Sequence, residues 1–242
     1  MKLVALNTWG GRTGQSLLDF FAQRQEIDAF LLQEVFDKGS RLTNFHNNAN
    51  LQLFEDISRQ LPNHRGYFAP AQDNEWGLAS FLKKSLPLHD IGDLFIHRHR
   101  DAMINRDGST VGKNIQYLKL VGHPTIINLH GLWNGQGKTD TADRLAQSKK
   151  LIDFAASLTG EFIIAGDFNL LPETMSLKII EQKLNLVNLI TKYGITSTRT
   201  SYYQKPLKFA DYILVTPGVR VRDFRVLPDE VSDHAALYLD FD

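Results

Sequence analysis

The chain has 242 residues, of which 43% are hydrophobic and 10% aromatic, a composition ordinary for a globular protein with a full core. Lys plus Arg and Asp plus Glu both total 27, so the net charge is zero and there is no overall basic excess of the kind that favours non-specific nucleic-acid binding. The absence of cysteine excludes disulfides and thiolate metal sites, and no apolar stretch approaches the ~20 residues needed to span a bilayer. The chain starts with a strand-like run and not a signal peptide, so we expect a cytoplasmic protein.

Short apolar runs bounded by turn residues predict ten strands. In chain order they cover residues 3–7, 29–33, 66–71, 77–83, 115–121, 125–129, 162–165, 211–216, 221–227 and 235–241. Residues 84–114 show no clear periodicity, and we expect a polar, loop-rich insertion there.

Apolar residues at helical spacing predict four helices, at residues 15–25, 51–60, about 141–158, and after Pro172. In the third helix, Leu145, Ile152 and Ala156 are expected to face inward, and Arg144 and Gln147 are interpreted as structural. Strands outnumber helices and many are joined by short turns, which favours packed sheets covered by helices. Without repeats or a long linker, residues 1–242 are expected to form one domain.

Polar side chains recur at the ends of the apolar runs. The set consists of Asn7, Glu34, His130, Asp167, Asn169, Asp211, Asp233 and His234. Its carboxylates and amides are hard oxygen ligands, which favour Mg²⁺ or Mn²⁺ over zinc. Its histidines offer proton transfer or hydrogen bonds to a charged substrate, so the combination points to phosphoryl chemistry.

The same ordered set closely resembles the endonuclease/exonuclease/phosphatase superfamily, which includes deoxyribonucleases, abasic-site endonucleases and inositol polyphosphate 5-phosphatases. The resemblance runs from residue 7 to residue 234 and includes the segments Gly166–Asn169 and Ser232–His234. It implies an α/β four-layer sandwich, with two mixed sheets face to face and helices on both outer faces. It also implies a Mg²⁺- or Mn²⁺-dependent hydrolase that cleaves phosphate esters by in-line attack of activated water.

The resemblance further implies roles for individual residues. Glu34 would be the principal metal ligand, with Asn7 and Asp233 close enough to assist. Asp167 would orient or deprotonate the attacking water, and Asn169 would donate to the charge that develops on phosphorus.

Two histidines complete the implied catalytic set. His234 would contact the phosphate or act as acid or base, held in one tautomer by Asp211. His130 would be the second phosphate-side histidine, with Glu75 as its carboxylate partner. Whether Asp167 or a histidine is the general base stays open.

Several residues near these motifs are candidates for substrate contacts, namely Arg199, Tyr202, Trp133 and Asn134. Trp9 stands where abasic-site endonucleases carry an acid, which argues against that subfamily. A membrane substrate is disfavoured because no apolar hairpin is present. We therefore expect a monomer that acts as a nuclease-type phosphodiesterase on single strands or ends; the alternatives are an enzyme for a small phosphate ester and an inactive binding protein.

Overall fold

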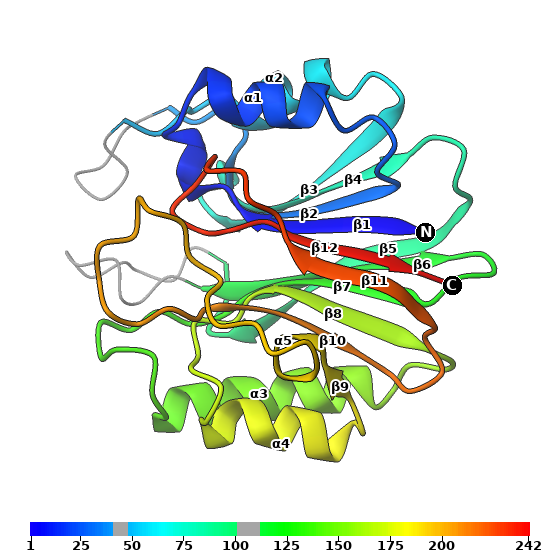
Figure 1. Cartoon of the computed structure of the whole chain (residues 1–242), viewed down its shortest axis with the longest axis vertical. Coiled ribbons are helices and arrows are strands. Elements are labelled where there is room, and N and C mark those ends of the chain that lie inside the picture. The colour runs from blue at the N-terminus through cyan, green and yellow to red at the C-terminus, as the bar shows by residue number, and fades with distance from the viewer. Residues whose placement is uncertain (41–47, 101–111) are drawn as a thin grey trace.

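The computed structural model describes residues 1–40, 48–100 and 112–242 of the chain. Two six-stranded sheets pack face to face, and helices cover the outer face of each, so the chain forms four layers (Figure 1). The predicted fold class, a four-layer sandwich of two mixed sheets, is confirmed. Both chain termini lie at one end of the strands, and long connections gather at the other end (Figure 1).

The first sheet has the order β11-β12-β1-β2-β4-β3. Its strands are β1 (Lys2–Asn7), β2 (Ala29–Phe36), β3 (His64–Gln72), β4 (Trp76–Lys83), β11 (Val221–Val226) and β12 (Leu237–Phe241). β1 and β2 are parallel and the other neighbours are antiparallel, so the sheet is mixed. A parallel pair needs a crossover, which helix α1 (Gln15–Ala22) provides.

The second sheet has the order β5-β6-β7-β8-β10-β9. Its strands are β5 (Leu88–His97), β6 (Lys113–Leu120), β7 (Thr125–His130), β8 (Phe162–Asp167), β9 (Val187–Asn188) and β10 (Asp211–Val215). Here β7 and β8 form the parallel pair, and helix α3 (Ala142–Ala155) is the crossover. Each sheet thus contains one strand–helix–strand unit.

Helices form the outer layers of the sandwich (Figure 1). α1 and α2 (Leu53–Gln60) cover the first sheet, while α3 and α4 (Met175–Lys183) cover the second. The short helices η1 (Trp9–Gly11) and α5 (Leu189–Lys192) lie within connections. Across residues 1–40, 48–100 and 112–242, no helix combines the length and the apolar character that crossing a membrane requires.

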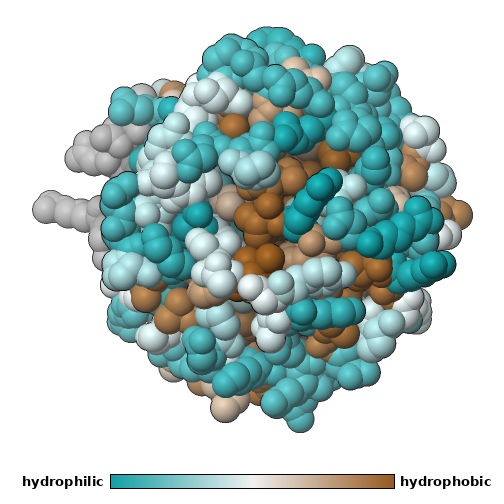
Figure 2. Space-filling view, in the orientation of Figure 1, coloured by the Kyte–Doolittle hydropathy of each residue, from teal (hydrophilic) through white to brown (hydrophobic). Residues whose placement is uncertain are grey.

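β1 is buried on both faces and therefore reads as a continuous apolar run. Leu3 and Ala5 join the core between the sheets, whereas Val4 and Leu6 pack under α1 and α2. Most of the visible face is hydrophilic, and apolar side chains concentrate over β11 and β12 (Figure 2).

A buried polar network links the two sheets near the site. Gln33 Nε2 donates to Asn128 Oδ1 at 2.7 Å, and Asn128 Nδ2 donates to the carbonyl oxygens of Leu32 and Ala79 in the first sheet. Because an unpaired polar group in this interior would be costly, the network favours one alignment of the two sheets.

Two predictions about this fold are wrong. Residues 88–97 of the expected loop-rich insertion form β5, paired with β6; residues 101–111 lie outside the described residues. β5 is an edge strand in which only Ile96 is buried, so it lacks an apolar period. In α3, Leu145 and Ala156 are exposed and Ile152 is half-buried, because the buried face carries a different set: Arg144, Gln147, Ser148, Leu151 and Ala155.

Candidate active site

One cavity of about 290 Å³ lies at the end of the sandwich opposite the termini. It is lined by residues of both sheets and of the connections between them: Trp9, Arg12, Glu34, Trp76, Lys113, His130, Trp133, Lys138, Asp167, Asn169, Arg199, Tyr203, Lys205, Asp233 and His234. All three tryptophans of the chain are in this set. The cavity therefore gathers acids, cations and aromatic rings from segments far apart in the sequence.

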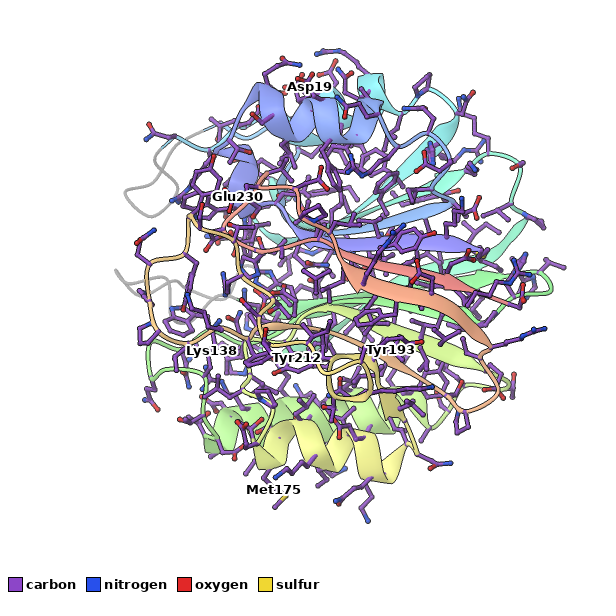
Figure 3. The ribbon with its side chains drawn as sticks, in the orientation of Figure 1. Asp19, Lys138, Met175, Tyr193, Tyr212 and Glu230 are labelled. Atoms are coloured by element: carbon purple, nitrogen blue, oxygen red, sulfur yellow. The ribbon has the colours of Figure 1, made fainter. Side chains whose placement is uncertain are left out.

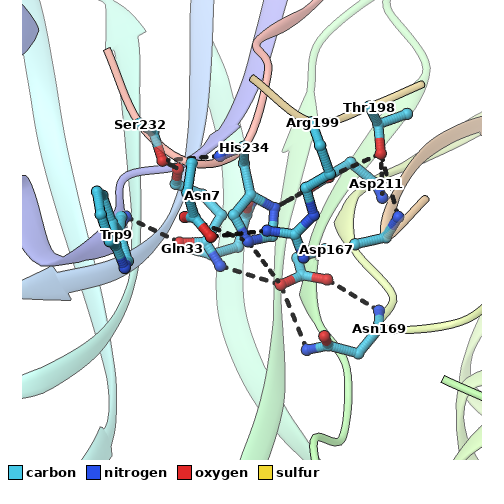
Figure 4. Close-up of polar contacts among 12 residues, drawn as sticks. Asn7, Trp9, Gln33, Asp167, Asn169, Thr198, Arg199, Asp211, Ser232 and His234 are labelled. Atoms are coloured by element: carbon cyan, nitrogen blue, oxygen red, sulfur yellow. Dashed lines mark hydrogen bonds and ion pairs between the residues drawn. The ribbon is translucent and has the colours of Figure 1, made fainter. Parts of the chain in front are cut away.

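Asp167 ends β8 and lies at the centre of this polar cluster (Figure 4). Its Oδ2 accepts hydrogen bonds from Asn7 Nδ2 at 3.0 Å and Asn169 Nδ2 at 3.3 Å, and its Oδ1 accepts one from the Asn169 backbone at 2.8 Å. The Asn7 amide also donates to Glu34 Oε1 at 3.2 Å. Asn7 therefore holds the two carboxylates side by side, and Asn169 orients Asp167.

Unusual backbone conformations place these side chains. Gly166 has φ 139°, and a Cβ there would lie 2.1 Å from the Leu129 carbonyl oxygen, so only glycine lets β8 approach β7 just before Asp167. Glu34 has φ 57° at a register break in β2, and Asn169 has φ 54°. Left-handed conformations at non-glycine residues store strain, and they cluster at functional sites.

His234 lies on one side of Asp167 and is paired with Asp211. Its Nδ1 lies 2.8 Å and 2.9 Å from the two Asp211 oxygens, and its Nε2 lies 3.8 Å from both Asp167 Oδ2 and Asp233 Oδ1. Burial, assisted by Arg199, lowers the pKa of His234 to about 4, and burial raises the pKa of Asp211 to about 6. The imidazole is thus neutral near pH 7, with its Nδ1–H donated to Asp211 and its Nε2 free to accept a proton.

His130 ends β7 on the other side of Asp167 and has a cation as its neighbour. Lys113 Nζ lies 3.0 Å from His130 Nε2 and 4.9 Å from the centre of the Trp76 ring. His130 Nε2 is also 3.8 Å from Glu34 Oε1 and 3.9 Å from Asp167 Oδ2. Burial and the nearby Lys113 charge hold the pKa of His130 well below its usual value, so this imidazole is neutral too.

The acidic side of the cavity fits a hard divalent cation. Oxygens of Glu34 and Asp167 and a nitrogen of His130 lie within 4.8 Å of one another, and Asp233 Oδ1 is buried without a hydrogen-bond partner. Burial raises the pKa of Glu34 to about 6, against the opposing effects of Lys113 and Asn7. A second group, Asp167 with Asp211 and His234, fits less well because Asp211 and His234 already bond each other.

Asp233 also pairs with a cation. Arg199 Nη1 donates to Asp233 Oδ2 at 2.9 Å, with both side chains largely buried. The guanidinium lies 4.1 Å from the centre of the Tyr203 ring. Arg199 and Trp133, which were both predicted to contact the substrate, are among the residues that line the cavity.

Other predicted site residues lie outside the cavity lining. Glu75 Oε2 accepts a hydrogen bond from the Ser40 backbone, while the nitrogens of His130 face Lys113. Asn134 bonds Thr141 and Gln136 within its own loop. Tyr202 is exposed, with its ring 6.0 Å from Trp9 at the rim.

Sequence reasoning missed Trp76, Lys113 and Lys138. Lys113 and Trp76 each stand at the start of a strand, so the rule that found the other polar residues at strand ends could have singled out Lys113. Lys138 lies in the loop after β7, at the end of the molecule opposite the termini (Figure 3). No local pattern distinguishes it from an exposed loop lysine.

The loop that carries Trp133 and Lys138 is held by the helix that follows it. Arg144 is fully buried and donates to the carbonyl oxygens of Leu132, Gly137 and Thr139. The interpretation of Arg144 as structural is thus in keeping with these contacts, which fix the loop at the cavity.

Comparison with known proteins agrees with this architecture. The model of the Endonuclease/Exonuclease/phosphatase family matches residues 4–234. A search of curated proteins found no match.

Solved structures share the fold over the whole chain. A mannosyl-6-phosphatase of Bacteroides thetaiotaomicron has a TM-score of 0.75 at 16% identity, covering 100% of this chain and 99% of that one. TDP2 of D. rerio, complexed with single-strand DNA product, has a TM-score of 0.70 at 14% identity, covering 100% and 98%. The human Nocturnin catalytic domain, with bound sulfate, has a TM-score of 0.66 at 20% identity, covering 100% and 94%.

Proposed function

The chain belongs to the Endonuclease/Exonuclease/phosphatase family, whose members are divalent-metal-dependent hydrolases of phosphate esters, and from this premise we propose that it is a Mg²⁺-dependent phosphodiesterase of the nuclease type. The observation that carries the proposal is the position of Asp167, which bonds Asn7 and Asn169 and lies 3.8–3.9 Å from both buried histidines. This arrangement suits attack of water on phosphorus, because it offers a carboxylate and two neutral imidazoles at one point.

Glu34 would be the principal ligand of the metal ion, with Asp233 Oδ1 and Asn7 close enough to assist. The bound ion would supply positive charge to the phosphate oxygens and lower the pKa of a bound water. Mg²⁺ is the ion we propose, since the donors are mainly oxygens.

The protein's own groups would divide the remaining work. The Asp167 carboxylate would orient the attacking water and accept its proton, and Asn169 would donate to the phosphate oxygens. His234, with Nδ1 fixed by Asp211, would take up a proton from solvent at Nε2 when the anionic substrate binds, and would then donate it to the phosphate or the leaving group. Lys113, which lies next to His130, would stabilise negative charge in the transition state.

We propose single-stranded nucleic acid, or the end of a strand, as the substrate. Cations lie against aromatic rings around the cavity: Arg12 on Trp9, Lys113 on Trp76, Arg199 on Tyr203 and Lys205 on Trp133. Aromatic rings stack bases, and cations track the phosphate backbone, in proteins that bind single strands. Since the net charge is zero, the basic groups at this cavity favour a local contact over a long duplex footprint.

A small phosphorylated compound is the second candidate. The cavity volume of about 290 Å³ is at the lower end of small-molecule sites. A similar structure is a mannosyl-6-phosphatase, whereas another was solved with single-strand DNA product. The fold alone is common to both, so the substrate must be tested directly.

The test is hydrolysis with Mg²⁺ of single-stranded and double-stranded oligonucleotides, bis-p-nitrophenyl phosphate and phosphomonoesters, with Asp167→Ala as the inactive control. We expect cleavage of single strands, lost in the variant and falling steeply with added salt. Turnover of small esters alone would overturn the nuclease proposal and leave a phosphoesterase. A monomeric state and a cytoplasmic location stay predictions.

A further inference from the structure

Lys138 is a buried cation in the lining of the cavity. Only 2% of the residue is exposed, and its Nζ donates to the Phe209 carbonyl oxygen at 2.7 Å. Among the residues that the structure describes, no carboxylate forms a salt bridge with it. An ammonium group has three donors. Burial, the largest effect, lowers the pKa of Lys138 to about 8, although the charges of Asp167, Asp211 and Asp233 raise it. Lys138 therefore has donors and charge available for an anion that enters the cavity.

Arg199 lies beside Lys138 and is also incompletely paired. Its Nη1 bonds Asp233, but its buried Nε has no hydrogen-bond partner. Arg199 and Lys138 lie 4.1 Å and 5.2 Å from the centre of the same Tyr203 ring. Two like charges on one ring repel each other, and the repulsion contributes to the lowered pKa of Lys138. An anion between them would relieve this repulsion.

These two cations are on the His234 side of the catalytic cluster. Arg199 forms a β-bridge with His234, and Figure 4 shows its side chain directed towards Asp167 from that side. Lys113, in contrast, contacts His130, which forms a potential ligand group with Glu34 and Asp167. The cavity thus has cations at two places, one next to His130 and one around Tyr203. A phosphate held at the metal ligands would leave the two cations around Tyr203 available.

We infer that Lys138, Arg199 and Tyr203 form a subsite for a second phosphate group next to the scissile phosphate. This inference rests on the proposed function and narrows it, because good substrates then carry two phosphates a few bonds apart. Consecutive phosphates of a nucleic-acid strand have this chemistry, and so do the two phosphates of a small bisphosphate. The Arg199 guanidinium and the Lys138 ammonium would both donate charge-assisted hydrogen bonds to the second phosphate.

The test compares substrates that differ only in a second phosphate. The dinucleotide TpT is compared with pTpT and TpTp, and glucose 6-phosphate with glucose 1,6-bisphosphate. We expect the wild type to prefer the doubly phosphorylated member of at least one pair by about tenfold or more in kcat/KM, as charge-assisted hydrogen bonds provide. The pair that shows the preference identifies the source of the second phosphate.

The variant Lys138→Met removes the charge and should abolish the preference, whereas Lys138→Arg should keep most of it. Lys113→Met is the matched control, because Lys113 is the other buried lysine of the cavity. It should slow both members of a pair equally and leave the preference intact. No preference in the wild type, or a preference unchanged in Lys138→Met, would overturn the subsite.

The outcomes separate the subsite from the proposed function. Equal cleavage of TpT, pTpT and TpTp, with no preference for the bisphosphate, overturns the subsite and leaves the phosphodiesterase. Hydrolysis confined to the sugar phosphates, with a preference for the bisphosphate, overturns the nuclease proposal and leaves the subsite. If nothing is hydrolysed, the proposed function fails, and the subsite is then tested by the affinity of the protein for the dinucleotides. Tryptophan fluorescence measures this binding, because all three tryptophans line the cavity. Tighter binding of pTpT than TpT, absent in Lys138→Met, supports the subsite, and equal binding overturns it.

Discussion

The parallel strand pair β1/β2 of one sheet and the parallel strand pair β7/β8 of the other have the same backbone arrangement, but they carry different polar residues at their ends. In both, a helix joins two neighbouring strands whose polar residues end at the cavity. The first pair supplies Asn7 and Glu34, whereas the second supplies His130 and Asp167. In the proposed function, the first unit would supply metal ligands and the second would supply groups that transfer protons. The comparison teaches that strand-end residues, more than the backbone unit, decide the chemistry.

The largest effect is expected at the contact between the two units, where Asp167 accepts from Asn7. Asp167→Asn keeps the shape but removes the negative charge, so we expect kcat to fall by about 10³-fold or more. Steady-state kinetics with saturating metal measures the loss. Unchanged thermal unfolding would confirm that the fold is intact, and near-normal activity would contradict the central position of Asp167.

Asp211→Asn tests how the second sheet orients His234. Asparagine cannot reproduce the carboxylate acceptor of the His234 Nδ1–H, so the imidazole tautomer is no longer fixed. We expect kcat to fall by about 10²-fold, with a small change in KM. The double variant with His234→Asn should be no slower than His234→Asn alone. Additive losses in the double variant would show that the two residues act separately.

Lys113→Met sharpens the contrast between the two histidines, since His130 has a cation as its neighbour and His234 a carboxylate. Loss of the ammonium should reduce kcat by about tenfold, because a charge near the phosphate is removed. It should also raise the pKa of His130, since the Lys113 charge lowers it. NMR titration of the metal-free protein measures this shift. A fall in the His130 pKa would contradict the assigned contact.

The smallest effect is expected for Glu75→Gln. Its carboxylate accepts from the Ser40 backbone, away from the cavity lining, so kcat should change by less than about twofold. Asp211→Asn, assayed in parallel, is the matched control for loss of a carboxylate. A large loss in Glu75→Gln would contradict this expectation and support the predicted partnership with His130.

Much of the site could be predicted because its residues follow recognisable strands. Apolar runs located β7 and β8, and their parallel register places His130 opposite Asp167. The resemblance to a known family then supplied the sandwich that brings Asn7 and Glu34 to the same place. The order of motifs along the chain therefore carried more information than any single motif.

The other residues of the site could not be predicted, because their positions depend on contacts between segments that are far apart in the sequence. Lys113 contacts His130 once β6 pairs with β7, and Lys138 meets Arg199 at Tyr203 only once distant loops have packed. Lys113 starts a strand, but Lys138 has no local signature, because charge alone is equally typical of exposed loops. The buried face of α3 was mispredicted for a similar reason: Arg144 is buried to bind a loop, which hydrophobic periodicity cannot reveal.

The most direct test of the account is the Mg²⁺ dependence of hydrolysis in Glu34→Gln and Asp167→Asn beside the wild type. If the first sheet holds the metal through Glu34, the Mg²⁺ concentration for half-maximal activity should rise at least about tenfold in Glu34→Gln. In Asp167→Asn, activity should stay low even at saturating Mg²⁺. An unchanged Mg²⁺ requirement in Glu34→Gln, or full activity of Asp167→Asn at high Mg²⁺, would contradict this division of chemistry between the sheets.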